Sequence, residues 1–152
     1  MRIMIVTDQY PPMVGGVPTV TQGLAVDFAE RGNQVWVIAP SYGQRDVHRI
    51  EHNVRVHRFS SFAWPTYGEL RIPFLPILPF RRILKKVDPD IIHIHSPVVL
   101  GNIAQIDTPY LTEMTSGLTY AVNRFRGWPH SGHITLVRGE RSRLADYASD
   151  IL

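Results

Sequence analysis

The sequence predicts a single α/β domain built on a parallel sheet with helices on both faces, and three observations support this. The chain has 152 residues, the size of one ordinary domain with one core. Hydrophobic residues make up 44% and charged residues 19%, as is typical of globular proteins. Short apolar runs rich in β-branched residues also alternate with a helical pattern, and such a β-α-β succession predicts parallel strands joined by right-handed crossovers.

The first strand and the first helix are predicted near the N-terminus. Residues 2–7 form an apolar run suited to a strand buried on both faces, and residues 8–16 form the loop after it. A helix then begins near Pro18, which suits a first turn, and ends at Gly32, a good C-terminal cap. Its apolar residues recur at helical spacing: Val17, Val20, Leu24 and Phe28.

The middle of the chain continues the alternation. Residues 35–39 and 54–59 are the second and third predicted strands, and residues 90–95 are the fourth. Residues 60–79 are rich in proline and aromatic side chains without a clean period, so we expect a long structured loop there. A basic helix is predicted over residues 80–87. The resulting architecture is Rossmann-like.

The pattern weakens towards the C-terminus. Residues 98–105 leave room for about two helical turns, which is short for a crossover, and residues 110–112 suit a fifth strand. A helix capped by Ser116 is predicted as far as Gly127, because Leu118, Val122 and Phe125 share one helical face. Nothing in the composition indicates a second domain.

Composition and missing motifs exclude several classes of protein. The sequence has no cysteine, which excludes disulfides and thiolate zinc sites, and we expect a cytoplasmic protein. The apolar run at the N-terminus is too short for a signal peptide, and prolines interrupt the longest apolar stretch. The net charge of +3, without a nucleic-acid-binding motif, predicts no nucleic-acid partner. No phosphate-binding P-loop or serine elbow indicates an NTPase or a hydrolase.

Two adjacent glycines stand between the first strand and its helix. Gly15 and Gly16 would let backbone N–H groups approach a ligand closely, and the helix N-terminus adds partial positive charge, which suits a phosphate. The alternative is that both glycines only form a tight turn. Their spacing is not that of a dinucleotide-binding motif, and Pro40 and Ser41 stand where such a motif has an acidic residue.

Two other groups of residues have competing interpretations. His93 and His95 alternate along a strand and point to the same side, so they form either a metal pair or, as we favour without a third ligand, a packed histidine and one at the sheet edge. The aromatic segment 62–80 and the basic residues after it form either a membrane-facing surface or an ordinary loop beside a solvated helix.

Three segments in order resemble one family of enzymes. They are DQYPPMVGGV at residues 8–17, GNQVWVIA at residues 32–39 and DPDIIHIHSP at residues 88–97. Together they resemble the N-terminal half of family-four, GT-B-fold retaining glycosyltransferases, clearly over residues 1–105 and more loosely over residues 106–152. Residues 61–76 are also similar to members that glycosylate membrane lipids.

The resemblance implies transfer of a sugar, with retention and without a metal or other cofactor, from a nucleotide-sugar donor to a hydroxyl acceptor, such as a membrane lipid that forms a glycolipid. It implies that Gly15, Gly16 and Val17 face the donor diphosphate. By position, the acceptor-binding candidates are Tyr10, Thr19 and His95. Such a protein would be cytoplasmic and peripheral to the inner face of the membrane. The catalytic residues are not identified.

Two departures limit what the resemblance implies. Met114 stands where the family has a histidine that contacts the donor sugar, and methionine cannot replace its hydrogen bonding. Nothing corresponds to the C-terminal nucleotide-sugar-binding domain, so we expect a truncated or split enzyme that is inactive alone. The alternatives are a non-catalytic docking module that recruits lipid or a separate donor-domain partner, and a small phosphate-ligand enzyme with its own complete site.

Overall fold

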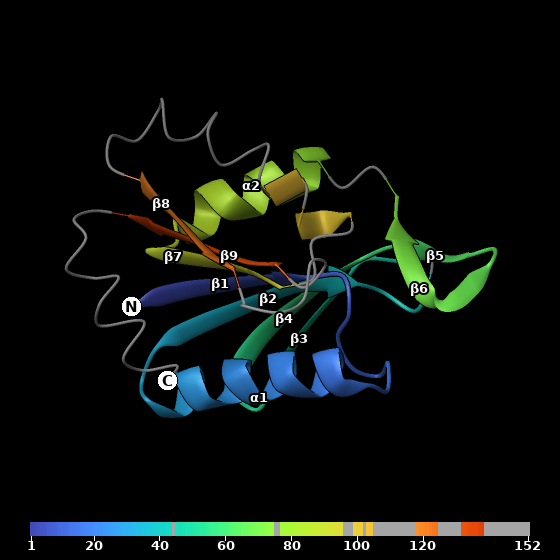
Figure 1. Cartoon of the computed structure of the whole chain (residues 1–152), viewed down its shortest axis with the longest axis horizontal. Coiled ribbons are helices and arrows are strands. Elements are labelled where there is room, and N and C mark those ends of the chain that lie inside the picture. Colours follow the sequence, from blue (N-terminus) through green and yellow to red (C-terminus); the bar gives the residue numbers. More distant parts are fainter. Residues whose placement is uncertain are drawn as a thin grey trace.

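The computed structural model has one mixed sheet between two helices, α1 (Gly16–Glu30) and α2 (Ile77–Val87) (Figure 1). It describes residues 1–43, 45–74, 77–95, 99–101, 103–104, 118–124 and 132–138. Within these residues the large sheet has seven strands in the order β3-β4-β2-β1-β7-β9-β8. Their bounds are β1 Arg2–Thr7, β2 Gln34–Pro40, β3 Val47–Glu51, β4 Val54–Phe59, β7 Ile91–His95, β8 Leu118–Arg124 and β9 Gly132–Arg138.

The centre of the sheet is parallel, as predicted. β1 pairs in parallel with both β2 and β7, and β2 pairs in parallel with β4. In register, Thr7 lies opposite His95, and Pro40 lies opposite Phe59. The carboxyl ends of four strands therefore meet at one edge of the sheet, where open α/β folds bind ligands. The sequence predicts a Rossmann-like parallel sheet, and the structure gives these parallel strands the order β4-β2-β1-β7.

Each helix covers one face of the sheet, and the alternation of β1 explains why residues 2–7 are continuously apolar. Ile3 and Ile5 pack in the core beneath α1, whereas Met4 and Val6 pack in the core beneath α2. Successive side chains of a strand point to opposite faces, so a strand between two helical layers buries every residue. Each fully buried aliphatic side chain contributes about 2 kcal/mol.

The predicted end of α1 is confirmed in detail. Gly32 has φ +83°, a left-handed conformation that favours glycine. The N–H of Gly32 donates to the carbonyl of Ala29 at 3.0 Å, and the N–H of Asn33 donates to the carbonyl of Phe28 at 3.2 Å. This pair of bonds is a Schellman motif, which satisfies carbonyls that the helix end would otherwise leave unpaired.

Two corrections concern the middle of the chain. The edge strand β3, antiparallel to β4, was not predicted. The long loop predicted over residues 60–79 is wrong in part, because β5 (Ser61–Trp64) and β6 (Tyr67–Pro73) form an antiparallel hairpin, and α2 begins at Ile77. A register shift at Ala63 and Trp64 breaks the period of two that would have marked the hairpin in the sequence.

The helix predicted to begin at Ser116 is also wrong, because residues 118–124 form β8, which pairs antiparallel with β9. The period of four between Leu118 and Val122 suggested a helix, but the segment is rich in residues that favour strands, and pairing with β9 decides its structure. Residues 100, 101, 103 and 104 are helical, in agreement with the short helix predicted there. The predicted strand at 110–112, and Met114, lie outside the described residues.

Candidate functional site

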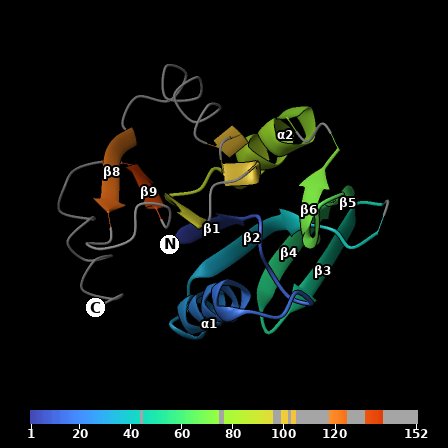
Figure 2. The same cartoon turned by 45° about the vertical axis from the view of Figure 1, so that its right-hand side comes forward.

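The loop after β1 leads from the carboxyl edge of the sheet to the N-terminus of α1 (Figure 2), and the two glycines stand where this helix begins. Gly15 is the N-cap of α1, no side chain caps the helix, and its first turn holds no acidic residue. The carbonyl of Gly15 accepts the N–H of Thr19 at 3.2 Å. Within the described part of the chain, the amides of Gly16 and Val17 have no hydrogen-bond partner. They are donors open to an anion.

The backbone conformation does not explain why both residues are glycines. Gly15 has φ 162°, an extended conformation that any residue adopts. A Cβ atom built on Gly15 would lie 3.5 Å from Cδ of Pro18, an ordinary contact, and one built on Gly16 would meet nothing within 4 Å. The tight-turn alternative therefore finds no support. What glycine provides here is an open surface over the helix N-terminus, where a ligand can approach the backbone.

The three acceptor-binding candidates lie at this end of the molecule but differ in exposure. Thr19 is exposed one turn into α1, and its Oγ1 donates to the carbonyl of Gly15 at 2.8 Å. His95 ends β7 beside Thr7 and is buried. Tyr10 is only 2% exposed and packs in the core beneath α1.

The Tyr10 phenol lies beside a charged pair. The Arg58 guanidinium is 5.2 Å from the centre of the Tyr10 ring. Burial, with the negative charge of Glu51, raises the pKa of Tyr10 to about 12 against the opposing charge of Arg58. The hydroxyl therefore remains a proton donor throughout the physiological range.

A pocket beside these residues contains a site that the sequence reasoning missed. Its volume is about 450 Å³, and Pro11, Tyr42, Glu51 and Arg58 are among the residues that line it. Nη2 of Arg58 lies 3.2 Å from both carboxylate oxygens of Glu51. Nη1 of Arg58 is buried and has no hydrogen-bond partner in the described part of the chain. The signal in the sequence was a basic residue on the same face of β4 as the buried Val54 and Val56.

A buried carboxylate ties the next segment of the chain to this edge. Asp8, at the end of β1, accepts the N–H of Val99 at 2.9 Å and the N–H of Leu100 at 2.8 Å. Both N–H groups lie at the start of the short helical segment that includes residues 100, 101, 103 and 104, so Asp8 acts as its N-terminal cap. The carboxylate thereby fixes the position of this turn next to the glycine loop.

The interpretation of His93 as a packed side chain and of His95 as one at the sheet edge fits the structure, because His93 is 5% exposed and His95 is the last residue of β7, although His95 is equally buried. Their ring centres lie 5.9 Å apart. Among the described residues, no group of three metal-ligating side chains comes together.

Comparisons with known proteins identify the family of the chain. The sequence profile of Glycosyltransferase Family 4 matches residues 14–113. The chain belongs to glycosyltransferase family 4. It is 36% identical over 107 residues to a GDP-mannose-dependent alpha-mannosyltransferase of Mycolicibacterium smegmatis, and 32% identical over 103 residues to one of Mycobacterium tuberculosis. Each match covers 66% of this chain and 27% of the relative, so the family 4 chain matches about a quarter of the length of these enzymes.

A relative with a different name also matches part of this family 4 chain. Protein PhoH2 of Bacillus subtilis is 51% identical to it over 55 residues, which is 36% of this chain and 12% of the relative.

In the part of the chain that the structure describes, no helix has the length and apolar character needed to cross a bilayer.

Proposed function

We propose that this chain is the acceptor-side half of a retaining glycosyltransferase, which moves a sugar from a nucleotide-sugar donor to a hydroxyl acceptor. One observation carries the proposal: Gly16 and Val17 present unpaired amides at the carboxyl edge of a parallel sheet, and neither packing nor backbone conformation requires glycine there. Because the chain belongs to glycosyltransferase family 4, sugar transfer is the reaction that we assign to this loop.

The donor diphosphate is the anion that we assign to this loop. A helix N-terminus carries about half a positive charge, and α1 leaves its first amides free to donate to phosphate oxygens. Donors aimed at a departing diphosphate stabilise the charge that develops on it, so we expect this transfer to need no metal. The names of the two mannosyltransferases make GDP-mannose the first donor to test.

The acceptor would bind in the pocket that Arg58 lines. Nη1 of Arg58, which is buried and unpaired in the described part of the chain, suits an anionic or hydroxyl-rich group. An unsatisfied guanidinium N–H is stabilised most by a new hydrogen-bond acceptor. The pocket lies beside the loop that follows β1, so an acceptor hydroxyl there would be close to the donor. Tyr10, Thr19 and His95 remain candidates for positioning it.

A lipid acceptor is favoured by the surface formed by α2 and the β5–β6 hairpin. Phe62, Trp64 and Phe74 of this region are exposed, and so are Ile77 and Leu78 in the first turn of α2. Further along α2, Lys85 and Lys86 are also exposed. Exposed apolar side chains next to cations suit an anionic membrane surface, where each lysine contributes about 1 kcal/mol.

Catalysis would require a donor-binding domain in addition to these residues. The nucleotide of the donor needs its own contacts, and the matched mannosyltransferases are much longer than their matched region. We therefore expect the 152-residue polypeptide alone to transfer sugar negligibly. Ordinary turnover of GDP-mannose by this polypeptide would contradict that expectation. A docking module without catalysis is the alternative, and the absence of transfer after addition of a donor-binding domain would favour it.

The anion site can be tested by NMR titration of the ¹⁵N-labelled chain with pyrophosphate and with GDP-mannose. We expect the amide signals of Gly15, Gly16 and Val17 to shift. Gly16→Val should abolish these shifts without unfolding the chain, because its Cβ meets nothing within 4 Å. Gly23→Val is the matched control, since Gly23 lies on the exposed face of the same helix with equally open space. Shifts that persist in Gly16→Val would contradict the site.

The membrane surface is tested separately by co-sedimentation with vesicles. Binding to vesicles containing phosphatidylglycerol should exceed binding to pure phosphatidylcholine vesicles. Leu78→Ser and Lys85→Gln should each weaken it about fivefold. Arg31→Gln is the control, because Arg31 lies at the end of α1 on the opposite face of the sheet (Figure 1). Equal losses in all three variants would contradict the assignment of this surface.

A further inference from the structure

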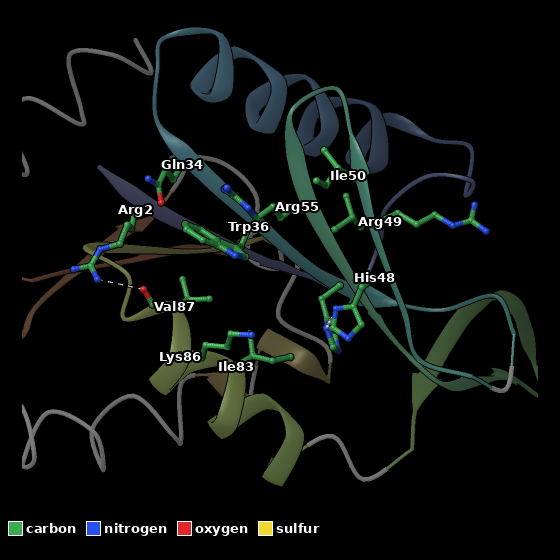
Figure 3. A pocket seen from close by; sticks show the side chains of 12 residues that line it. Arg2, Gln34, Trp36, His48, Arg49, Ile50, Arg55, Ile83, Lys86 and Val87 are labelled. Carbon is green, nitrogen blue, oxygen red and sulfur yellow. Dashed lines mark hydrogen bonds between the residues drawn. The ribbon is translucent and has the colours of Figure 1, made fainter.

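A second cavity lies at the opposite end of the sheet from the glycine loop. It has a volume of about 670 Å³, which is in the range of small-molecule sites. Arg2 and Gln34, the first residues of β1 and β2, line it, and so do Ile83 and Lys86 of α2 (Figure 3). It therefore occupies the face of the sheet that α2 covers, near the amino ends of the strands. The anion site does not extend to it, and the acceptor pocket shares one lining residue with it, Arg49 of the edge strand β3.

The wall of this cavity is apolar and partly aromatic. Trp36 of β2 and Ile83 of α2 are only partly buried, although they pack against the core. Ile50 of β3 lines the same cavity with 73% of its surface exposed. Three large apolar side chains that meet solvent around one hollow are more than the scattered exposed residues of an ordinary surface.

The rim of the cavity is cationic. Arg49, Arg55 and Lys86 line it, and within the described residues none of them has an ion pair. No aspartate or glutamate is among its lining residues. Arg55 lies over the Trp36 ring at 4.9 Å from the ring centre, so positive charge and an aromatic surface stand side by side. Arg2 differs, because Asp88 and Asp90 already neutralise it.

One end of the cavity is formed by two histidines. Nδ1 of His57 lies 2.6 Å from Nδ1 of His48, so one ring donates a proton to the other. His57 is 7% exposed, and its Nε2 has no hydrogen-bond partner in the described part of the chain. Buried polar atoms of a protein core usually have a hydrogen-bond partner, so this Nε2 atom offers a hydrogen-bonding position to a ligand or a water molecule.

We propose that this cavity binds a small organic anion with a planar apolar body. The body would lie against Trp36 and Ile50, and the anionic group would lie between Arg55 and Lys86. The residues that line the cavity support both the apolar body and the anionic group of this ligand. A purely apolar ligand would make no ion pair with the cations, and an inorganic anion would leave the apolar wall exposed to water. The proposal is independent of sugar transfer, since the four residues that would contact the ligand line neither the glycine loop nor the acceptor pocket.

Phenyl phosphate is the probe that tests both halves of the proposal. Titrations followed by ¹⁵N NMR should shift the amides of Gln34, Trp36 and Ile50, with an affinity at least about tenfold above those of inorganic phosphate and of phenol. Lys86→Gln should weaken binding about fivefold. Lys85→Gln is the matched control, because Lys85 is the exposed neighbour on the same helix and does not line the cavity.

Failure of this proposal and failure of the anion site at Gly16 give different results. Gly16→Val should leave the binding of phenyl phosphate at the cavity unchanged. Shifts confined to Gly15 and Gly16, equal losses in Lys86→Gln and Lys85→Gln, or phosphate binding as tightly as phenyl phosphate would each overturn the proposal.

A different observation carries a second inference, about the origin of the β8–β9 hairpin. The mannosyltransferases match 66% of the chain, and PhoH2 is a relative with a different name that matches 36% of it. The family profile ends at residue 113, and β8 and β9 both follow it. The sheet also changes there, from the parallel strands β4, β2, β1 and β7 to the antiparallel strands β9 and β8.

We infer that the β8–β9 hairpin belongs to a PhoH2-like segment joined to the family 4 part, whose sheet is stable without it. Hydrogen exchange of the full chain tests this. Thr135→Pro removes one N–H from β9, opposite His93 of β7, and should expose the amides of β8 and β9 while β1, β2 and β4 remain protected. Thr135→Ala, which keeps the N–H, is the control. Loss of protection in β1 and β2 would overturn the inference.

Discussion

Replacement of His57 should make the protein less sensitive to mild acid. Burial, reinforced by the charge of His48, lowers the pKa of His57 to about 4 from its usual 6.5, against the opposing charge of Asp46. The unfolded chain therefore binds a proton at this histidine as the pH falls through 6.5, whereas the folded chain does not until about pH 4. Protonation of this histidine therefore stabilises the unfolded state relative to the folded state. The free energy of unfolding should fall between pH 6.5 and about pH 4 and level off at lower pH.

The magnitude follows from the two pKa values. A tenfold difference in proton affinity corresponds to about 1.4 kcal/mol, so His57 should cost the fold at most about 3 kcal/mol between pH 6.5 and pH 4. This is a large part of the stability of an ordinary domain, about 5 to 15 kcal/mol. His57→Leu replaces the ring with an apolar side chain of similar size and should remove this loss.

Urea denaturation followed by tryptophan fluorescence, at several pH values from 7.5 to 4, measures the effect. His57→Leu should lose less stability than the parent protein over this interval. His52→Asn is the control, because His52 is exposed in the turn between β3 and β4, where its φ of 50° suits asparagine. It should follow the parent protein. If His57→Leu loses as much stability in acid as the parent protein, His57 is not the group that titrates.

Three further substitutions test contacts that hold the fold and the site. Asp8→Ala should destabilise the protein by about 3 kcal/mol in urea denaturation, because the buried N–H of Leu100 and the partly buried N–H of Val99 lose a charged acceptor. An effect below that of an average surface substitution would contradict the capping role. Asp90→Asn should cost about 1 kcal/mol at neutral pH. Burial opposes ionisation of Asp90, but hydrogen bonds from the N–H and the guanidinium of Arg2 lower the pKa of Asp90 below its usual 3.8. The cost of Asp90→Asn should therefore disappear as the pH falls below 3.8. A cost independent of pH would refute the pairing. Gly32→Ala should lower the thermal midpoint, at a cost of about 1 kcal/mol, because Gly32 has positive φ, whereas Gly23→Ala should not lower it.

Local patterns were sufficient where one physical demand determined the structure. The continuous apolar run at residues 2–7 predicted a strand buried on both faces, and Gly32 predicted the end of α1, because each property depends on a few adjacent residues. The errors came where pairing partners decided the outcome. Residues 118–124 fit a helical period, but β9 makes them a strand, and the register shift in the β5–β6 hairpin removed its alternation.

The candidate site shows the same division. Gly15 and Gly16 were identified from their position between a strand and a helix, but the sequence could not exclude a tight turn, because that depends on φ and on what a Cβ atom would meet. Arg58 was missed, because its importance depends on Glu51, Tyr10 and a pocket assembled from several loops and strands.

By itself, the sequence determined the Rossmann-like alternation of strands and helices, the glycine loop and the resemblance to a family, because these depend on neighbouring residues and short periods. Only the tertiary structure decided which donors are left open, that Arg58 is buried with an unpaired N–H, and that a cationic cavity lies at the far end of the sheet. Burial and pairing depend on residues distant in the chain, and no local pattern records them.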